Sequence, residues 1–277
     1  MINISLAMEA PNQLLKDLPY ITDFDWVLTH LCEDSNEYLA HYQNIVAQTN
    51  REVILDNSVN ELGEPLGLGR MDEVVVQLNP DYIVPPDYLN NLEATLGILD
   101  EAIDLWGKNR ILPVLQGTSI KEVLECADIL ANKYEFKIVS VPYDVTLAHR
   151  SKLPSDDFNR AELEELAETR IKIMSALVKN GITFNRYHLL GMNTLEEFRS
   201  YRKQSFWMST KAWGGFYPEI SVDTGAPITN ALNGIQFGKG HLIPKGVYFD
   251  YYNERYKDSE YRDWYWNICV LRGSLND

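Results

Sequence analysis

Acidic and amide side chains close several of the short apolar runs that read as β-strands. These residues are Asp56 after "EVIL", Asp87 after "DYIVPP", Gln116 and Gly117 after "RILPVL", and Asp223 after "EISV". Carboxylates gathered around one mouth could perform acid/base or nucleophilic chemistry. Aspartates at strand ends can equally cap the helices that follow them. An active site is therefore expected only if these segments converge in space.

Strand-like runs alternate with amphipathic helical patterns along nearly the whole chain. The strands are expected at 25–30, 52–56, 81–87, 110–117, 136–144 and 187–191, and the helices at 35–50, 88–106, 119–134, 160–180 and 194–204. Both 206–210 and 219–223 could form the seventh strand. This order fits a (β/α)8 TIM barrel or an open doubly wound sheet. No glycine-rich phosphate loop follows the first strand, and polar residues end many strands, which favours the barrel.

The composition limits the class of protein. The chain has 277 residues, 45% of them hydrophobic, which fits one large α/β domain or two smaller ones. Because no linker interrupts the pattern, we expect a single domain over residues 1–277. The net charge of −15 argues against binding nucleic acid through a bulk positive field, but it leaves room for a local basic groove.

Neither a metal site nor a targeting segment is expected. Cys32, Cys126 and Cys269 lie far apart and form no CxxC or Cys/His spacing, so neither a disulfide framework nor structural zinc is supported. The start "MINISLAMEA" lacks a basic region and a long apolar run, and no run approaches transmembrane length. A cytoplasmic protein without a metal or cofactor, and without membrane contact, is expected.

Four segments in order resemble the tRNA-guanine transglycosylase superfamily. They are "DYIVPPD", "LPVLQG", "YHLLGMNTLEEF" and "DTGAPITNALNG". The last is the most specific, because an Asp, a Pro four residues on and a Thr-Asn-Ala-x-Asn-Gly run resemble that family's nucleophile segment. Asp81 and Asp87 reproduce its strand with acids at both ends. The resemblance covers about residues 55–235.

The departures from the family point to one branch of it. The chain has no counterpart of the cysteine-rich zinc insert or the C-terminal extension of the tRNA enzymes. After Asp56 it has "NSVNE" in place of a glycine-glycine-aromatic stretch. This compact, zinc-free form resembles the DNA-modifying branch of phages and bacterial islands, which exchanges guanine in DNA for a 7-deazaguanine. The resemblance implies DNA and a free 7-deazaguanine base as substrates, and the host cytoplasm if the protein is phage-encoded. It is compatible with a homodimer.

The resemblance also implies a role for each site residue. Asp223 would be the nucleophile of a double displacement, and Asp56 the general acid/base. Asp87 would accept from N1–H and the exocyclic amine of the purine. The Gln116 amide and the Gly117 backbone N–H would face O6. Gly191 would let the backbone approach the base, or would simply serve a turn, and Asn57 would add a polar contact.

Nucleic acid would also need a phosphate-binding surface, because the target base must leave the stack. The candidates are Arg150, Lys152, Arg202, Lys203, Lys239 and Lys245, each of which could equally be a solvated surface residue. The aromatic-rich segment 247–267 is expected to close the barrel and its last helix, with base stacking as the alternative.

Three other functions fit the same residues. The chain could be a zinc-free enzyme that exchanges bases in RNA, including tRNA. It could be a retaining glycoside hydrolase with Asp56 and Asp223 as its carboxylate pair. It could also be a binding module that has kept the barrel without activity, although the intact aspartate set argues against that.

Overall fold

The protein has a mixed α/β fold built on parallel strands. A computed structural model describes residues 4–143, 160–192, 197, 218–237, 251–252 and 257–276. The described strands form one sheet of order β1-β7-β6-β5 and a second of order β2-β3-β4, parallel throughout. Their bounds are β1 Ile4–Ala7, β2 Asp25–Leu28, β3 Val53–Asp56, β4 Tyr82–Ile83, β5 Ile138–Pro142, β6 Arg186–Leu190 and β7 Glu219–Asp223. The expected α/β class is thereby confirmed.

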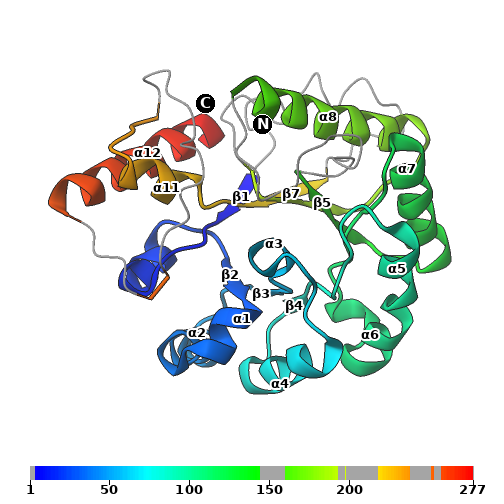
Figure 1. The fold of residues 1–277 in the computed structure, drawn as a ribbon, viewed down its shortest axis with the longest axis horizontal. Helices are drawn as coiled ribbons and strands as arrows, with labels where there is room; N and C mark the ends of the chain where they lie inside the picture. The colour runs from blue at the N-terminus through cyan, green and yellow to red at the C-terminus, as the bar shows by residue number, and fades with distance from the viewer. Residues whose placement is uncertain are drawn as a thin grey trace.

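Apart from the short α3, which lies near the centre of the view, the helices lie around the outside of the strands (Figure 1). Their bounds are α1 Thr29–Asp34, α2 Asn36–Gln48, α3 Val59–Leu62, α4 Leu68–Leu78, α5 Leu92–Gly97, α6 Leu99–Trp106, α7 Ile120–Asp128, α8 Arg160–Lys179, α11 Ala226–Leu232 and α12 Asp258–Asn276. Shorter 3-10 helices cover Asn12–Tyr20 and Lys108–Arg110, and a π-helical turn over Ile129–Lys133 extends α7. Among the described residues, no helix is long and apolar enough to cross a membrane.

Side-chain caps set several helix starts where the sequence predicts them. The Ser35 hydroxyl accepts from the Tyr38 amide at 3.2 Å, and the Ser119 hydroxyl accepts from the Glu122 amide at 3.3 Å. Each bond satisfies one N–H group that the first turn leaves unpaired. The single helix expected over 88–106 is instead two helices, and Asn91 caps the first through the Ala94 amide at 3.0 Å.

The strand expected over 110–117 is wrong as a continuous strand. Only two isolated parallel bridges occur there, Ile111 to Ile83 and Val114 to Ser140. Pro113 lies between them and has no N–H to donate, although its carbonyl accepts from the Ser140 amide at 2.7 Å. We call 111–114 the seam, because it joins β4 of one sheet to β5 of the other.

β1 is a strand that the sequence pattern did not reveal. Its four residues pair with β7, and it also contacts the segment before β2, because the Asp23 amide donates to the Leu6 carbonyl at 2.7 Å. A strand of four residues is too short to show the periodic pattern by which strands are recognised in a sequence. The run expected at 25–30 is shorter than expected, since β2 ends at Leu28 and α1 begins at Thr29. Of the two candidates for a late strand, 219–223 is β7 and 206–210 lies outside the described residues.

The core lies between these strands and the surrounding helices. Val53, Ile54 and Leu55 of β3 are fully buried, and the strand then ends in Asp56. Each such aliphatic side chain contributes about 1.5–3 kcal/mol on burial. The apolar part of each strand is thus anchored in the core, which fixes the position of the polar residue at its carboxyl end.

Candidate active site

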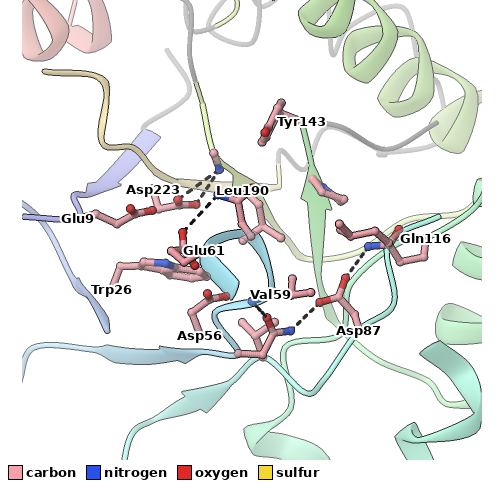
Figure 2. Close-up of a pocket in the computed structure, with 16 residues that line it drawn as sticks. Glu9, Trp26, Asp56, Val59, Glu61, Asp87, Gln116, Tyr143, Leu190 and Asp223 are labelled. Carbon is pink, nitrogen blue, oxygen red and sulfur yellow. Dashed lines mark hydrogen bonds between the residues drawn. The ribbon is translucent and has the colours of Figure 1, made fainter. Parts of the chain in front are cut away.

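A pocket opens at the carboxyl ends of the strands, with about 550 Å³ of atom-free space when its open mouth is included. Six of the seven residues expected to carry catalysis and base binding line it, namely Asp56, Asn57, Asp87, Gln116, Gly191 and Asp223. Asp56 ends β3 and Asp223 ends β7, and the others lie in the segments that follow β3, β4, the seam and β6. Residues more than 160 positions apart in the sequence therefore share one hollow (Figure 2).

One side of the pocket is an amide–carboxylate network centred on Asp87. Asn57 Nδ2 donates to Asp87 Oδ1 at 2.6 Å, and Gln116 Nε2 donates to Asp87 Oδ2. All three side chains are buried. Burial raises the pKa of Asp87, while the hydrogen bonds from Asn57 and Gln116 lower it in part. The carboxylate is thus held rigidly by two donors and keeps lone pairs for a ligand.

The two amides have few atoms left for a ligand. Asn57 Nδ2 gives its second hydrogen to the Pro85 carbonyl at 2.8 Å, and its Oδ1 accepts from the Val59 amide at 2.9 Å. Gln116 Oε1 accepts from the Asn90 amide at 2.8 Å. Asn57 therefore orients Asp87, whereas one Nε2 hydrogen of Gln116 is not used by any of the described residues and is left for a ligand.

The opposite side of the pocket is acidic. Glu9, Asp56, Glu61 and Asp223 gather there, facing Asp87 and Gln116 across the hollow (Figure 2). Asp56 ends β3, Asp223 ends β7, Glu9 follows β1, and Glu61 belongs to the short helix α3.

Burial and mutual repulsion favour protonated acids on this side. Burial raises the pKa of Asp56 well above its ordinary value, and the charges of Glu61 and Asp223 raise it further. The Ser58 amide, which donates to Asp56 Oδ2 at 2.9 Å, opposes this in part. Burial likewise raises the pKa values of Glu9 and Glu61. A carboxyl that keeps its proton near neutral pH can act as a general acid.

The turn after β3 gives these acids their geometry. Ser58 adopts a left-handed conformation with φ of 60°, which is uncommon for a residue other than glycine. The side chains of Asp56 and Asn57 each accept from the amide two residues on, which holds the turn. The turn starts α3, and α3 brings Glu61 over the pocket.

Asp223 lies among hydrogen-bond donors that stabilise a carboxylate. The Gly191 amide donates to its Oδ1 at 3.1 Å and to its Oδ2 at 3.2 Å, and His188 Nε2 lies 3.1 Å from Oδ1. The side chain is buried. An ionised, oriented carboxylate in a pocket is the requirement for a nucleophile.

Of the two glycines predicted for the site, each must be glycine for a different structural reason. Gly191 has φ of +60°, and a Cβ there would lie 2.7 Å from Tyr143 Cδ1. At Gly117 a Cβ would lie 2.8 Å from the Cβ of Glu122, so this glycine allows close packing on α7. Gly117 is not among the residues that line the pocket, so its expected contact with O6 has no support in this geometry.

Several pocket residues were not predicted. They are Glu9, Trp26, Glu61 and Tyr143, together with His188 behind Asp223. Glu9 follows β1, so recognition of that strand would have revealed it by the same strand-end rule. His188 is a polar residue inside the apolar run "YHLLG", which was a usable signal. Tyr143 directly follows β5, so the strand-end rule would have revealed it as well, whereas Glu61 carries no sequence signal of its own because a short helix positions it.

The expected phosphate-binding residues cannot be located. Arg150, Lys152, Arg202, Lys203, Lys239 and Lys245 all lie outside the described residues. Within the aromatic-rich segment, Trp264 is buried in α12, whereas Tyr265 and Trp266 are exposed. Among the described residues, no group of three or more His, Cys, Asp or Glu side chains could hold a metal ion.

Comparison with known proteins yields only distant structural likeness. No protein-family model matches the chain, and no curated protein sequence matches it. Phosphoribosyl anthranilate isomerase from Thermococcus kodakaraensis is 11% identical, with a TM-score of 0.46 over 82% of this chain and 90% of its own. N-(5'-phosphoribosyl)anthranilate isomerase from Pyrococcus furiosus is 9% identical, with a TM-score of 0.41 over 99% of this chain and 100% of its own. Such TM-scores carry no functional argument, so the chemistry of the pocket must carry it.

Proposed function

We propose that this protein is a transglycosylase that exchanges guanine in DNA for a free 7-deazaguanine base. The exchange would proceed by double displacement through a covalent glycosyl-aspartate. The observation that carries the proposal is that Asp56, Asp87, Gln116 and Asp223 line one pocket. The family resemblance selects these four from distant parts of the sequence, and base exchange requires them together.

The proposed scaffold is a closed (β/α)8 barrel. The seam joins the two sheets on one side, and the Asp23–Leu6 hydrogen bond joins β1 to the start of β2 on the other. The seven strands and the seam would then occupy the eight strand positions of the barrel, in sequence order. A pocket at the carboxyl ends of the strands is where barrel enzymes carry their active sites.

In the first step Asp223 attacks C1′ of the target nucleotide. The Oδ–C1′ bond forms while the C1′–N9 bond breaks, and the electron pair of the broken bond goes to the departing guanine. Asp56, whose pKa is raised by burial, delivers the proton that neutralises the leaving base. The carboxylate also stabilises the positive charge that develops on the sugar.

The second step reverses the first with a different base. The incoming 7-deazaguanine attacks C1′ through N9 and gives its N9 proton to Asp56. The C1′–O bond breaks, and the electron pair returns to the Asp223 carboxylate. Two inversions give overall retention, and Asp56 regains the proton that the next cycle needs.

Base selection would fall to the opposite side of the pocket. Asp87 accepts from the N1–H and the exocyclic amine, and the remaining Nε2 hydrogen of Gln116 faces O6. A base without these groups would leave a buried polar atom unpaired, which costs about 1–3 kcal/mol. Asn57 contributes by holding Asp87, since both of its amide hydrogens are already used.

A retaining glycoside hydrolase is the second candidate. Trp26 and Tyr143 line the same pocket as Asp56 and Asp223, and aromatic side chains offer apolar surfaces to a ring. The buried network of Asp87, Asn57 and Gln116 favours a purine edge over a sugar, so we rank base exchange first.

The test is capture of the covalent intermediate. The protein is incubated with a guanine-containing DNA oligonucleotide without any free base and is analysed by intact mass and denaturing gel. The expected product is an adduct with the mass of the protein plus the DNA minus one guanine. Asp223→Ala should abolish the adduct, whereas Asp104→Ala, at an exposed position on α6, should leave it unchanged.

The alternatives give different results in the same assay. Adducts on tRNA and not on DNA would identify an RNA enzyme. Turnover of simple aryl glycosides without an adduct on any nucleic acid would identify a glycoside hydrolase. An adduct that survives Asp223→Ala would contradict the proposed nucleophile.

A further inference from the structure

We infer that His188 is a positioning residue that holds Asp223 Oδ1, so that Oδ2 is the oxygen that bonds to C1′. The inference rests on the proposed function, because it assigns a task within that reaction. It concerns a chain of hydrogen-bonded side chains behind the pocket, from the half-buried Glu52 and Arg186 through Ser221 to His188 and Asp223, all three of which are buried.

The His188 ring is fixed by its neighbours. It is fully buried in β6, beside β7, and stacks on Trp26 with ring centroids 4.5 Å apart and an interplanar angle of 12°. Phe24 packs against it edge-on, with centroids 5.9 Å apart. Because both contacts restrict ring rotation, the two ring nitrogens point in set directions, Nε2 toward Asp223 and Nδ1 toward Ser221.

The hydrogen-bond donors then determine where the ring carries its proton. Arg186 Nε donates to the Ser221 hydroxyl oxygen at 3.0 Å, since a guanidinium has no acceptor. Ser221 Oγ lies 3.0 Å from His188 Nδ1, so its own proton is free to donate to that nitrogen. Because a carboxylate oxygen can only accept, we assign the single N–H of a neutral ring to Nε2, where it points at Asp223 Oδ1, and Nδ1 accepts from Ser221.

The far end of the chain is anchored by an ion pair. Arg186 donates to both Glu52 oxygens, at 2.7 and 2.6 Å. Glu52 precedes β3 and Arg186 begins β6, so the anchor lies at the amino ends of the strands, opposite the pocket. Arg186 is therefore held in the orientation that directs its Nε toward Ser221.

The two oxygens of Asp223 are consequently unequal. Oδ1 receives both the His188 N–H and the Gly191 N–H, each at 3.1 Å, whereas Oδ2 receives the Gly191 N–H alone among the described residues, at 3.2 Å. The less engaged oxygen keeps more electron density for attack. After the bond forms, Oδ1 becomes the ester carbonyl, and the same donors stabilise the carboxylate when it departs in the second step.

The test compares two replacements of His188 by the rate of adduct formation at saturating DNA. His188→Phe keeps a ring that can stack on Trp26 but removes the donor, and we expect a rate roughly 100-fold lower. His188→Gln supplies an amide N–H of similar reach, and we expect it to recover at least a tenth of the wild-type rate. The DNA concentration at half-maximal rate should stay unchanged in both, because neither variant alters the base-binding side.

A serine pair supplies the matched control. Ser221→Ala should lower the rate, because it removes the donor to Nδ1. Ser140→Ala should not, because that buried serine lies on β5, on the other side of β6 from Ser221, and its hydroxyl has no hydrogen-bond partner among the described residues. Nitrogen-15 NMR of the histidine side chains should show His188 at pH 7 as neutral, with its proton on Nε2.

The outcomes separate this inference from the proposed function. A wild-type protein that forms no adduct would overturn the proposed reaction, and the positioning role with it. An active wild type together with an unimpaired His188→Phe, or with a His188 ring protonated on Nδ1, would overturn the positioning role alone. Equal losses in His188→Phe and His188→Gln with normal thermal melts would also contradict it.

Discussion

The backbone amide of Gly191 donates to both carboxylate oxygens of Asp223, at 3.1 and 3.2 Å. The contact joins the end of β6 to the end of β7, and it exists because Gly191 turns its N–H toward the pocket with φ of +60°. The nucleophile proposed here is thus aimed by backbone as well as by the His188 side chain.

Gly191→Ala should therefore damage both stability and activity. A Cβ would lie 2.7 Å from the Tyr143 ring in a conformation unfavourable for alanine, and relief of the clash would move the amide away from Asp223. We expect a loss of about 2–3 kcal/mol in unfolding free energy and at least a tenfold slower adduct formation. Urea unfolding and single-turnover assays measure these effects.

Gly181→Ala is the matched control for that variant. Gly181 has φ of +75° but nothing within 4 Å of an added Cβ, so it carries the backbone cost without the clash. Gly181→Ala should lose about 1 kcal/mol in unfolding free energy and should form the adduct at the wild-type rate. Equal behaviour of the two variants would show that the Tyr143 contact and the bond to Asp223 do not matter.

Asn57→Ala should weaken base recognition by releasing Asp87. The substitution removes donors to the Pro85 carbonyl and to Asp87 Oδ1. We expect a loss of about 1–3 kcal/mol in stability and roughly a tenfold rise in the KM of the incoming base. The surface variant Asn132→Ala, which loses only an exposed bond to Asp128, should change neither quantity. An unchanged KM for Asn57→Ala would argue against a base-reading role for Asp87.

The rate of adduct formation should fall as pH rises. The first step of the proposed reaction needs a proton on Asp56, and burial together with Glu61 and Asp223 raises the pKa of that carboxyl well above its ordinary value. The proton is present below the raised pKa and is lost as pH increases through it. Single-turnover rates from pH 5 to 9 test this. Asp56→Asn should be slower by about 10²–10⁴-fold and should lack the alkaline fall. A wild-type rate that climbs steadily with pH would contradict the assignment.

Glu61→Gln should stabilise the protein at alkaline pH. Burial raises the pKa of Glu61, and its Oε2 is buried with no hydrogen-bond partner among the described residues. A raised folded-state pKa means that the stability present at low pH is lost as the group ionises. Removing the charge should therefore add about 1 kcal/mol at pH 8 and less at pH 5. Glu64→Gln at an exposed position is the comparison, and an equal gain there would point to a general charge effect.

The sequence predicted the main carboxylates because each one ends an apolar run. Asp56 and Asp223 close strands of four and five residues, and the parallel arrangement brings their ends to one edge. Asp87 and Gln116 were found in the same way, although β4 and the seam are far less regular than expected. The strand-end rule uses only the position at which an apolar run ends. It therefore found Asp87 and Gln116 although the strands before them are shorter or less regular than predicted.

The remaining site residues reach the pocket through tertiary contacts, and these leave no periodic pattern in the sequence. β1 is too short to be recognised, so Glu9 was missed with it, and Glu61 reaches the pocket only because the turn at Ser58 starts a helix there. Gly117 was assigned to the base by the family resemblance, whereas its lack of a side chain serves packing on Glu122. His188 was recognisable as a polar residue inside an apolar run, but its contact with Asp223 follows only from the pairing of β6 with β7.

The seam around Pro113 gives the two sheets a common pocket but few shared backbone bonds. Asp223 and its donors belong to one sheet and Asp56 to the other, while Gln116 follows the seam itself. Mild heat or denaturant that loosens this junction would draw the nucleophile and the acid apart while each sheet remains folded. Catalysis should accordingly fail at a lower temperature than global melting, and the interval between the two would measure how firmly the halves are joined.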